Sequence, residues 1–288
     1  MNKIVAGIMG QNCERFIDMC LESVKDADAI VYLDGGSTDK TIQIVYEFFE
    51  TKAKAGIDDC HVIENAYDQD DLGMNGRQRN YFLSHIKRRY PDDWVIFLDA
   101  DEVVEDFSKI KDIINITPAG IYSTKMRHLI QDLSHEDNTV PKHYVPNRLF
   151  KVSEADKYPE VEHPVLIPKE GAKIGLLDDP VIWHLAYIPN LWEIKRRYDN
   201  HMKKSNIHTP EFLKQWYYWH LFGSYPKKQF NPEELPEIIL NKFGIDKDEI
   251  YFQNRTIEMK HPIQVKSWYD HFKPESVLDL GCGRGCYL

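Results

Sequence analysis

The sequence has few cysteines, and their spacing indicates neither a metal site nor a disulfide framework. Five of its 288 residues are cysteine, and no two of them form a CxxC pair. Neither a structural zinc site nor a set of disulfides is therefore expected. A reducing compartment suits such a chain best, and we predict a cytoplasmic protein.

Basic residues are also scarce relative to acidic ones. Lysine and arginine number 36 against 46 aspartates and glutamates, which gives a formal net charge of -10. An acidic surface repels the phosphates of DNA and RNA, so we expect no nucleic-acid partner. A single nucleotide can still bind if a metal cation neutralises its phosphates locally.

Long apolar runs are missing as well. None approaches the roughly 20 residues that a membrane-spanning helix needs. The apolar stretch at the N-terminus is interrupted too early for a signal peptide. Internal repeats and low-complexity tracts are also lacking. We therefore expect a chain without a transmembrane segment.

The first third of the sequence alternates short apolar runs with amphipathic stretches. This pattern predicts an α/β fold with a largely parallel sheet and helices on both of its faces. In such folds the ligand binds at the carboxyl ends of the strands. The expected strands are 3–9, 29–33, 61–64 and 94–98, and the expected helices are 14–25, 39–49 and 76–89.

The pattern changes after Pro118, where β segments are separated by long polar loops. We expect strands at 120–129, 145–152 and 180–185, followed by helices at 191–204, 211–222 and 232–243. The predicted organisation is a catalytic domain over 1–230, a helical extension or linker over 231–273, and a separate segment over 274–288.

Two aspartates follow the fourth expected strand, in the segment Trp94–Glu102. Alternate side chains of an extended chain share a face, so Asp99 and Asp101 can converge on one point. Carboxylates are ligands that Mn²⁺ and Mg²⁺ accept, and a cation there could bridge the phosphates of a nucleotide. The other interpretation is that both residues cap a helix and line a solvated loop.

Other polar residues stand near expected element ends. Asp34 ends the second strand before Gly-Gly-Ser-Thr-Asp-Lys-Thr, where it could bind a nucleobase or ribose, or simply shape a turn. Arg77 and Arg79 lie near a helix start, where they could contact a diphosphate or form solvated ion pairs.

These motifs together resemble the glycosyltransferase family 2 type of nucleotide-sugar transferase, whose fold is called GT-A. An N-terminal strand, DGGSTDKT, an RN pair at Arg79-Asn80 and LDADE follow one another over about residues 1–190 in the order of that family. The resemblance implies that Asp34 binds the nucleoside, and that Asp99 and Asp101 bind the metal and the donor. It also implies transfer of a sugar from a UDP- or GDP-sugar to a hydroxyl of a glycan or other acceptor, with inversion.

The resemblance continues less regularly beyond Pro118. Asn147-Arg-Leu-Phe-Lys151 is similar to the family's RLF segment, but the expected adjacent His and Glu are replaced by Glu160-Val-Glu-His-Pro164. An inverting transferase needs a base near the acceptor hydroxyl. Glu162 is the first candidate, with Glu160 and His163 behind it. All three could instead belong to a solvated surface loop.

Some relatives place a histidine where His184 stands, as a further metal ligand. A nitrogen ligand there would suit Mn²⁺ better than Mg²⁺. The alternative is a histidine packed in the core beside Trp183.

Two later stretches also allow more than one interpretation. The aromatic run over 216–222 could pack a helix core, stack on a sugar acceptor or touch a membrane surface. The basic cluster Lys195-Arg-Arg197 could be a solvated face or a lid over the pyrophosphate.

The end of the chain resembles another family. Val277-Leu-Asp-Leu-Gly-Cys-Gly-Arg-Gly285 is similar to the first motif of class I S-adenosylmethionine-dependent methyltransferases, so we expect the truncated start of a fused methyltransferase domain. Methyl transfer is one alternative function, and a non-catalytic sugar-binding module is another. Nucleotidyl transfer is disfavoured, because Gly7-Ile-Met-Gly10 is a poor version of the glycine-rich loop it requires.

Overall fold

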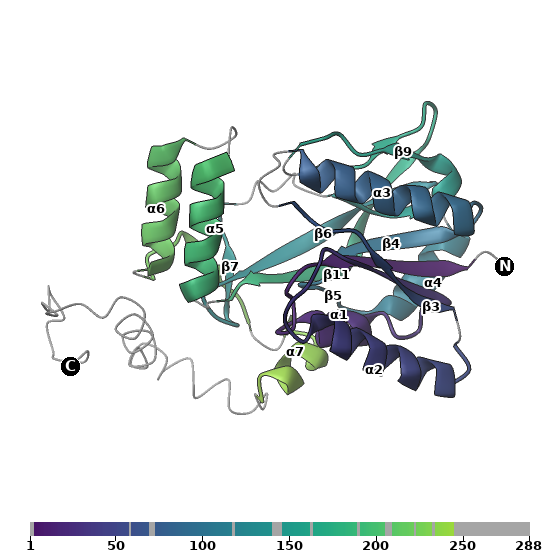
Figure 1. The fold of residues 1–288 in the computed structure, drawn as a ribbon, viewed down its shortest axis with the longest axis horizontal. Coiled ribbons are helices and arrows are strands. Elements are labelled where there is room, and N and C mark those ends of the chain that lie inside the picture. The colour runs from purple at the N-terminus through teal and green to yellow at the C-terminus, as the bar shows by residue number, and fades with distance from the viewer. Residues whose placement is uncertain are drawn as a thin grey trace, which may run out of the picture.

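The fold is described from a computed structural model of the chain. It describes residues 3–244, except for 58, 69–72, 117–118, 140–145, 162–163, 189–190, 205–208, 222 and 232–233. The methyltransferase-like segment 274–288 and most of the expected extension 231–273 therefore lie outside the described residues. Figure 1 shows a large sheet with helices on both sides, and β9 and β10 form a separate two-stranded sheet.

The elements follow the chain in an order that begins as alternating strands and helices. The strands are β1 Ile4–Gly10, β2 Ala29–Asp34, β3 Cys60–Glu64, β4 Trp94–Asp99, β5 Glu102–Val104, β6 Ile121–Ile130, β7 His135–Asp137, β8 Asn147–Lys151, β9 Ala155–Lys157, β10 Ile167–Pro168, β11 Ile174–Tyr187 and β12 Lys227–Gln229. The helices are α1 Ile17–Ser23, α2 Thr41–Lys54, α3 Met74–Arg89, α4 Phe107–Ile116, α5 Leu191–Lys204, α6 Pro210–Leu221 and α7 Glu237–Lys242, with a short 3₁₀ turn at Val152–Glu154.

The main sheet has ten strands and is parallel in its first part. Its order is β12-β7-β6-β8-β4-β1-β2-β3, with β11 beside β6 and β5 beside β11. Strands β3, β2, β1 and β4 run parallel, and β8 joins β4 antiparallel. The prediction of an α/β fold with a central, mostly parallel sheet flanked by helices is confirmed. The antiparallel pairs involve strands from β5 onward, and from β6 to β11 no α-helix separates consecutive strands in the described part of the chain.

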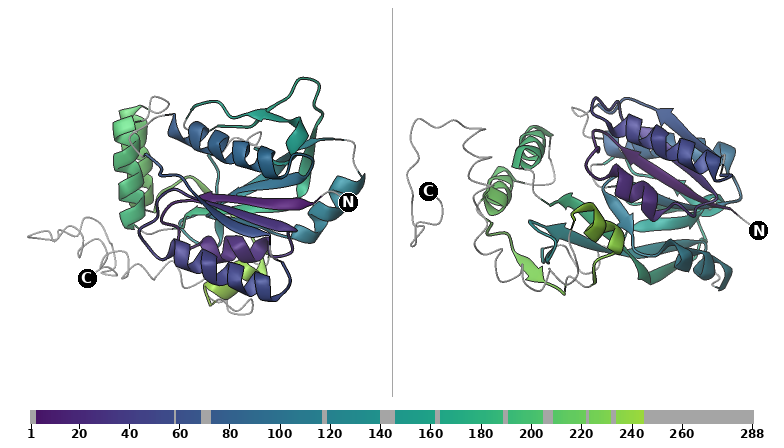
Figure 2. Two further views of the ribbon diagram at one scale, coloured as in Figure 1. Left: turned by 45° about the vertical axis from the view of Figure 1, so that its right-hand side comes forward. Right: turned by 90° about the horizontal axis from the view of Figure 1, so that it is seen from below.

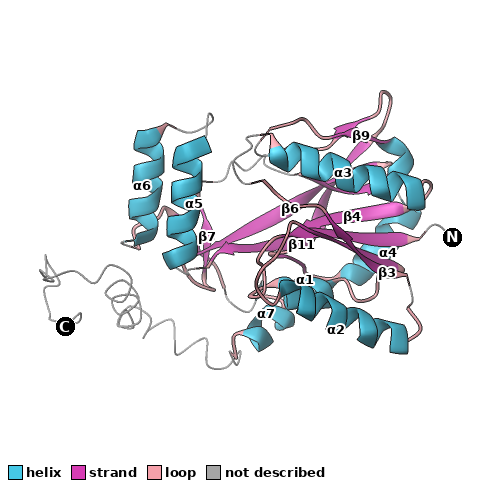
Figure 3. Ribbon diagram, in the orientation of Figure 1, coloured by secondary structure: helices cyan, strands magenta, loops and turns pink. Residues whose placement is uncertain are grey.

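Alternating side chains of the central strands enter two different cores. Ile4, Ala6 and Ile8 of β1 pack with α1, α2 and α4 on one face. Val5 packs with α3 on the other face, where Phe82 is fully buried. Figure 3 shows α3 above the sheet and α1, α2 and α7 below it. This two-sided burial explains the nearly continuous apolar sequence of β1, β2 and β4.

The register of the parallel strands brings the predicted aspartates to one edge. Met9 lies opposite Asp99 of β4, and its neighbour Gly10 lies opposite Asp34 of β2. Both aspartates end their strands, with β1 between them. Their location at the carboxyl edge is the one expected for a ligand site in a parallel sheet.

Helices α5 and α6 pack together beyond the end of this sheet. Figure 2 shows the pair standing beside the sheet rather than over its faces. A separate small core of Ile130, Ile194, Trp216 and Tyr225 joins the pair to the sheet. The helix α7 belongs elsewhere, because its Ile239 and Leu240 share a core with residues of α1, β5 and β11. The described part of the expected extension therefore packs onto the preceding domain.

Each expected strand and helix overlaps an observed one. The expected helix 191–204 coincides with α5, and the expected strand 180–185 is part of the longer β11. The expected helix 232–243 is shorter, since α7 begins at Glu237. Among the described residues, no helix has the length and apolar character that crossing a membrane requires.

Candidate functional site

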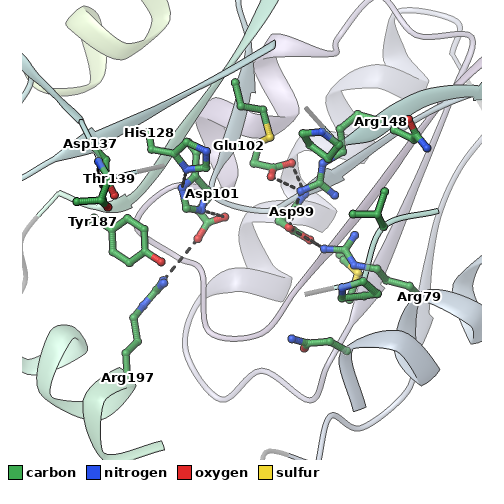
Figure 4. Close-up of a pocket in the computed structure, with 18 of the residues that line it drawn as sticks. Arg79, Asp99, Asp101, Glu102, His128, Asp137, Thr139, Arg148, Tyr187 and Arg197 are labelled. Carbon is green, nitrogen blue, oxygen red and sulfur yellow. Dashed lines mark hydrogen bonds and ion pairs between the residues drawn. The ribbon is translucent and has the colours of Figure 1, made fainter. Parts of the chain in front are cut away.

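A cavity of about 730 Å³ opens between the carboxyl end of β4 and the α5–α6 pair. Its walls combine charged groups near the sheet with aromatic groups on the helical side, as Figure 4 shows in part. This is the size and composition of a typical small-molecule site. The residues that line the cavity include Arg79, Asp99, Asp101, Glu102, His128, Asp137, Thr139, Arg148, His184, Tyr187, Arg197, Phe212, Trp216 and Tyr225.

The carboxylate of Asp99 is held between two arginines. Arg79 of α3 donates from Nη2 to both oxygens of Asp99, at 2.6 and 2.8 Å. Arg148 of β8 donates to Oδ2 at 2.9 Å and also pairs with Glu102. Both arginine side chains are at least nine-tenths buried. Asp99 is therefore fixed by charge-assisted bonds, which are the strong ones in proteins.

Glu102 completes a closed turn after β4. Its Oε2 accepts the backbone N–H of Asp99 at 2.9 Å, and its side chain is 1% exposed. Burial raises the pKa of Glu102, and the charge of Asp99 raises it further against the opposing effect of Arg148. For Asp99 burial acts in the same direction, but Arg79 and Arg148 hold its pKa well below the usual range. This network fixes the turn that contains Asp101, one of the two residues between Asp99 and Glu102.

Asp101 points into the cavity and faces a histidine. Its Oδ1 lies 3.8 Å from Nε2 of His184, and its Oδ2 lies 3.6 Å from Nη2 of Arg197. Both distances are longer than hydrogen bonds. Burial raises the pKa of Asp101, with Arg197 opposing this effect and Asp99 adding to it. A buried carboxylate of this kind gains stability from an added cation.

The Asp101–His184 pair fits a divalent cation better than the full predicted set does. An oxygen and a nitrogen ligand face each other across a gap, which suits Mn²⁺. Asp99 is oriented toward its two arginines instead, and no cluster of three His, Cys, Asp or Glu side chains suited to a metal occurs in the described part of the chain. In this structure Arg79 and Arg148 donate to the oxygens of Asp99, and the expected ligand set of Asp99, Asp101 and His184 remains a prediction.

Asp34 uses its carboxylate within its own loop. Oδ2 accepts the N–H groups of Gly36 and Ser37 at 2.9 and 2.8 Å, and Oδ1 accepts the Ser37 hydroxyl at 2.6 Å. The side chain is buried, and Asp34 is not among the described residues that line the cavity. Asp34 therefore shapes the turn after β2, which is one of the two interpretations. A direct role in nucleoside binding remains a prediction.

The expected catalytic base is not located by the structure. Glu162 and His163 lie outside the described residues. Glu160 is described: its exposed side chain forms an ion pair with Arg77 at 2.8 Å and is not among the residues that line the cavity, so its role as a base remains a prediction. The solvated-loop interpretation applies to Glu160 because its carboxylate is directed to the surface.

Several cavity residues carried no predicted role. Arg148 stands in the RLF segment, and its partnership with Asp99 depends on the antiparallel pairing of β8 with β4. His128 of β6 lies beside His184 because β6 and β11 are paired. Arg197 belongs to the basic cluster for which a lid was one interpretation, and it does line the cavity, whereas Lys195 pairs with Asp199. No motif in the sequence pointed to Asp137 as a residue of the site.

The sequence was compared with known families and proteins. Residues 8–128 match the family described as Glycosyl transferase family 2. The match runs from β1 into β6 and contains Asp99, Asp101 and His128. No curated protein was found that matches the chain.

Solved structures of low sequence identity are also similar to this chain. TarS residues 1–349 from S. aureus, in complex with UDP, is 14% identical, with 98% of this chain and 95% of that chain covered and a TM-score of 0.45. A mannosyltransferase, PcManGT from Pyrobaculum calidifontis, in complex with GDP-Man and Mn²⁺, is 11% identical, with 94% and 84% covered and a TM-score of 0.45. A longer S. aureus TarS structure is 15% identical with a TM-score of 0.44; the similarity covers 76% of this chain and 43% of that one, so this chain spans less than half of it.

Proposed function

We propose that this chain is a glycosyltransferase that moves a sugar from a nucleoside diphosphate sugar to an acceptor hydroxyl with the help of a divalent cation. The observation that carries the proposal is the pair of Asp101 and His184, 3.8 Å apart at the carboxyl edge of the sheet and on the wall of the cavity. The family match over residues 8–128, which contain this aspartate, supports it.

The charges of the site suit a diphosphate once a cation is present. At the β4 end of the cavity, the carboxyl groups of Asp99, Asp101 and Glu102 lie beside the guanidinium groups of Arg79, Arg148 and Arg197. A bound divalent cation would supply Lewis-acid stabilisation of the departing diphosphate. Arg197 stands beside the same position and adds a guanidinium, whose geometry matches phosphate. Arg79 and Arg148 are committed to Asp99 and so act by orienting the turn.

The two aspartates have different roles because their surroundings differ. Asp99 is held by two arginines and fixes the backbone, whereas Asp101 projects toward the cavity as the cation ligand. We expect Mn²⁺ to support stronger binding than Mg²⁺, because His184 provides a nitrogen ligand. Inversion at the anomeric carbon remains the expected stereochemistry, with Glu162 as the first candidate for the base.

The test is donor binding measured by calorimetry for a panel of UDP-, GDP- and dTDP-sugars, with and without Mn²⁺. We expect one donor to bind in a Mn²⁺-dependent manner, and Asp101→Ala and His184→Ala to lose this dependence. Asp178→Ala is the matched control, since Asp178 is an exposed aspartate of β11 outside the cavity. The proposal would be refuted if the affinity for the donor changed neither on removal of Mn²⁺ nor in the Asp101→Ala and His184→Ala variants.

The same samples separate the alternative functions. A sugar-binding module without catalysis would bind the donor but release no nucleoside diphosphate over time. Metal-independent binding of S-adenosylmethionine would support the methyl-transfer prediction made from residues 277–285, which lie outside the described residues.

A further inference from the structure

The side of the cavity opposite β4 has a wall of aromatic rings. Tyr187 ends β11, Trp216 lies on α6 and Tyr225 follows α6, and all three line the cavity. The rings of Tyr187 and Trp216 are 6.2 Å apart and nearly perpendicular. His220 packs behind them, 4.6 Å from Trp216 and 4.7 Å from Tyr225. Because each ring is held by another, the wall is rigid and does not have to be ordered when a ligand binds.

One carboxylate is fixed beside this wall. Oδ1 of Asp137 accepts the backbone N–H and the hydroxyl of Thr139, both at 2.6 Å. Oδ2 accepts the hydroxyl of Tyr225 at 3.1 Å. A carboxylate has about four acceptor positions, so these three bonds orient Asp137 and leave capacity for a ligand hydroxyl. Figure 4 shows Asp137 and Thr139 on one side of Tyr187 and Arg197 on the other.

The two ends of the cavity therefore differ in chemistry. Near β4 the wall carries Arg197 beside Asp101. The guanidinium of Arg197 suits phosphate once a cation is bound, while Arg79 and Arg148 are paired with Asp99. At the aromatic end the described walls carry Asp137, whose negative charge repels phosphate. The guanidinium of Arg197 stands between the two ends, 3.6 Å from Asp101 and 5.5 Å from the centre of the Tyr187 ring. A ligand at the aromatic end must bring an apolar face and donor hydroxyl groups, but no negative charge.

We propose that this aromatic end is an acceptor subsite for a neutral saccharide. A pyranose has a face of C–H groups that packs on aromatic rings, and hydroxyls at its edge that donate to a carboxylate. The subsite consists of Tyr187, Trp216, Tyr225 and Asp137, with Phe212 at its rim, where that ring is 40% exposed. The inference rests on the proposed function. The aromatic end can hold an acceptor only if the end with Asp101 and His184 binds the donor.

The experiment is saturation-transfer difference NMR with methyl pyranosides of glucose, galactose, mannose and N-acetylglucosamine and with their β-linked disaccharides. The protein is kept with Mn²⁺ and the nucleoside diphosphate that it binds. We expect at least one sugar to receive saturation on its ring protons. Asp137→Asn and Phe212→Ala should each weaken that sugar's binding by roughly tenfold.

Tyr218→Ala is the matched control, because Tyr218 is exposed on the same helix and is not among the described residues that line the cavity. It should leave sugar binding unchanged. The proposal is overturned if no sugar of the panel binds while the nucleotide does, if both cavity variants bind like wild type, or if the sugar binds only when the nucleotide is left out. Failure of the proposed function looks different, since Mn²⁺-dependent nucleotide binding would then be missing from the start.

Discussion

His128 and His184 face each other through their Nδ1 atoms at 2.9 Å. Only one of two neutral imidazoles can donate in such a contact. If His184 donates, its Nε2 carries the lone pair that faces Asp101, which is the tautomer a metal ligand needs. Burial and the neighbouring His184 lower the pKa of His128 to about 3, so His128 stays neutral and its Nδ1 can accept this hydrogen bond.

We therefore expect His128→Phe to weaken Mn²⁺ binding by roughly tenfold, because His184 loses the partner that selects its tautomer. His128→Asn should recover part of the affinity, since its amide oxygen can accept the same hydrogen bond. Mn²⁺ titration followed by electron paramagnetic resonance measures the change. His85→Phe is the control: it breaks the other close histidine pair, His61–His85 at 3.3 Å, which does not line the cavity. Equal Mn²⁺ affinity of His128→Phe and wild type would contradict this role.

The two aspartates of the β4 turn should differ in their contribution to stability. Asp99→Asn leaves the buried side chains of Arg79 and Arg148 without their shared counter-charge, and we expect the free energy of unfolding to fall by about 3 kcal/mol. Asp101→Asn removes a carboxylate whose pKa is raised by burial and that is repelled by Asp99, so its effect should stay within about 1 kcal/mol. Urea denaturation of both variants checks this order. Comparable losses for the two would show that Asp99 has no special structural role.

Gly76 is the point where α3 meets the segment before the candidate base. A Cβ atom at this position would lie 2.0 Å from the carbonyl oxygen of Pro159 and 2.6 Å from Cα of Glu160, both of which are backbone atoms. We expect Gly76→Ala to destabilise the protein by about 1–3 kcal/mol, because the backbone must shift to relieve the overlap. Thermal unfolding measures it, with Ser84→Ala on the exposed side of the same helix as the control. An unchanged melting temperature would mean that the segment adapts without cost.

His220 should make stability depend on pH. Burial, together with the charge of Arg197, lowers its pKa from 6.5 to about 3, so protonation favours the unfolded chain. The neutral His220 makes its full contribution to the free energy of unfolding above pH 6.5. This contribution is lost progressively as the pH falls from 6.5 toward 3. Between pH 7 and 4.5 we expect His220→Phe to lose roughly 2 kcal/mol less stability than wild type. Urea denaturation at both values tests this, and parallel losses would exclude His220 as the cause.

The elements of the first half were predictable because their signals are local. The apolar runs of β1, β2 and β4 and the periods of α1 to α3 each lie within one segment, and the observed bounds differ by only a few residues. Helix α4 was not predicted, although Phe107, Ile110 and Ile114 have a helical spacing. The three-residue strand β5 is too short to show any period.

The contacts of the site were less accessible to sequence reasoning. Asp99 and Asp101 stand at the end of a strand, as the sequence predicted, but the pairing of Asp99 with Arg148, 49 residues away, could not be predicted. Asp137 and Arg197 reach the cavity through β7 and α5, whose positions follow from long-range pairing and packing. Neither hydrophobic period nor spacing contains that information.

The ring cluster around Trp216 has its own small core, apart from the two cores that sandwich the sheet. Changes in α6 can therefore reshape the proposed acceptor subsite while the turn around Asp101 stays intact. Under the proposed function, we expect relatives that share the first half of this fold to differ in acceptor where the helical hairpin of α5 and α6 differs. Grafting that hairpin between such relatives is expected to alter acceptor preference.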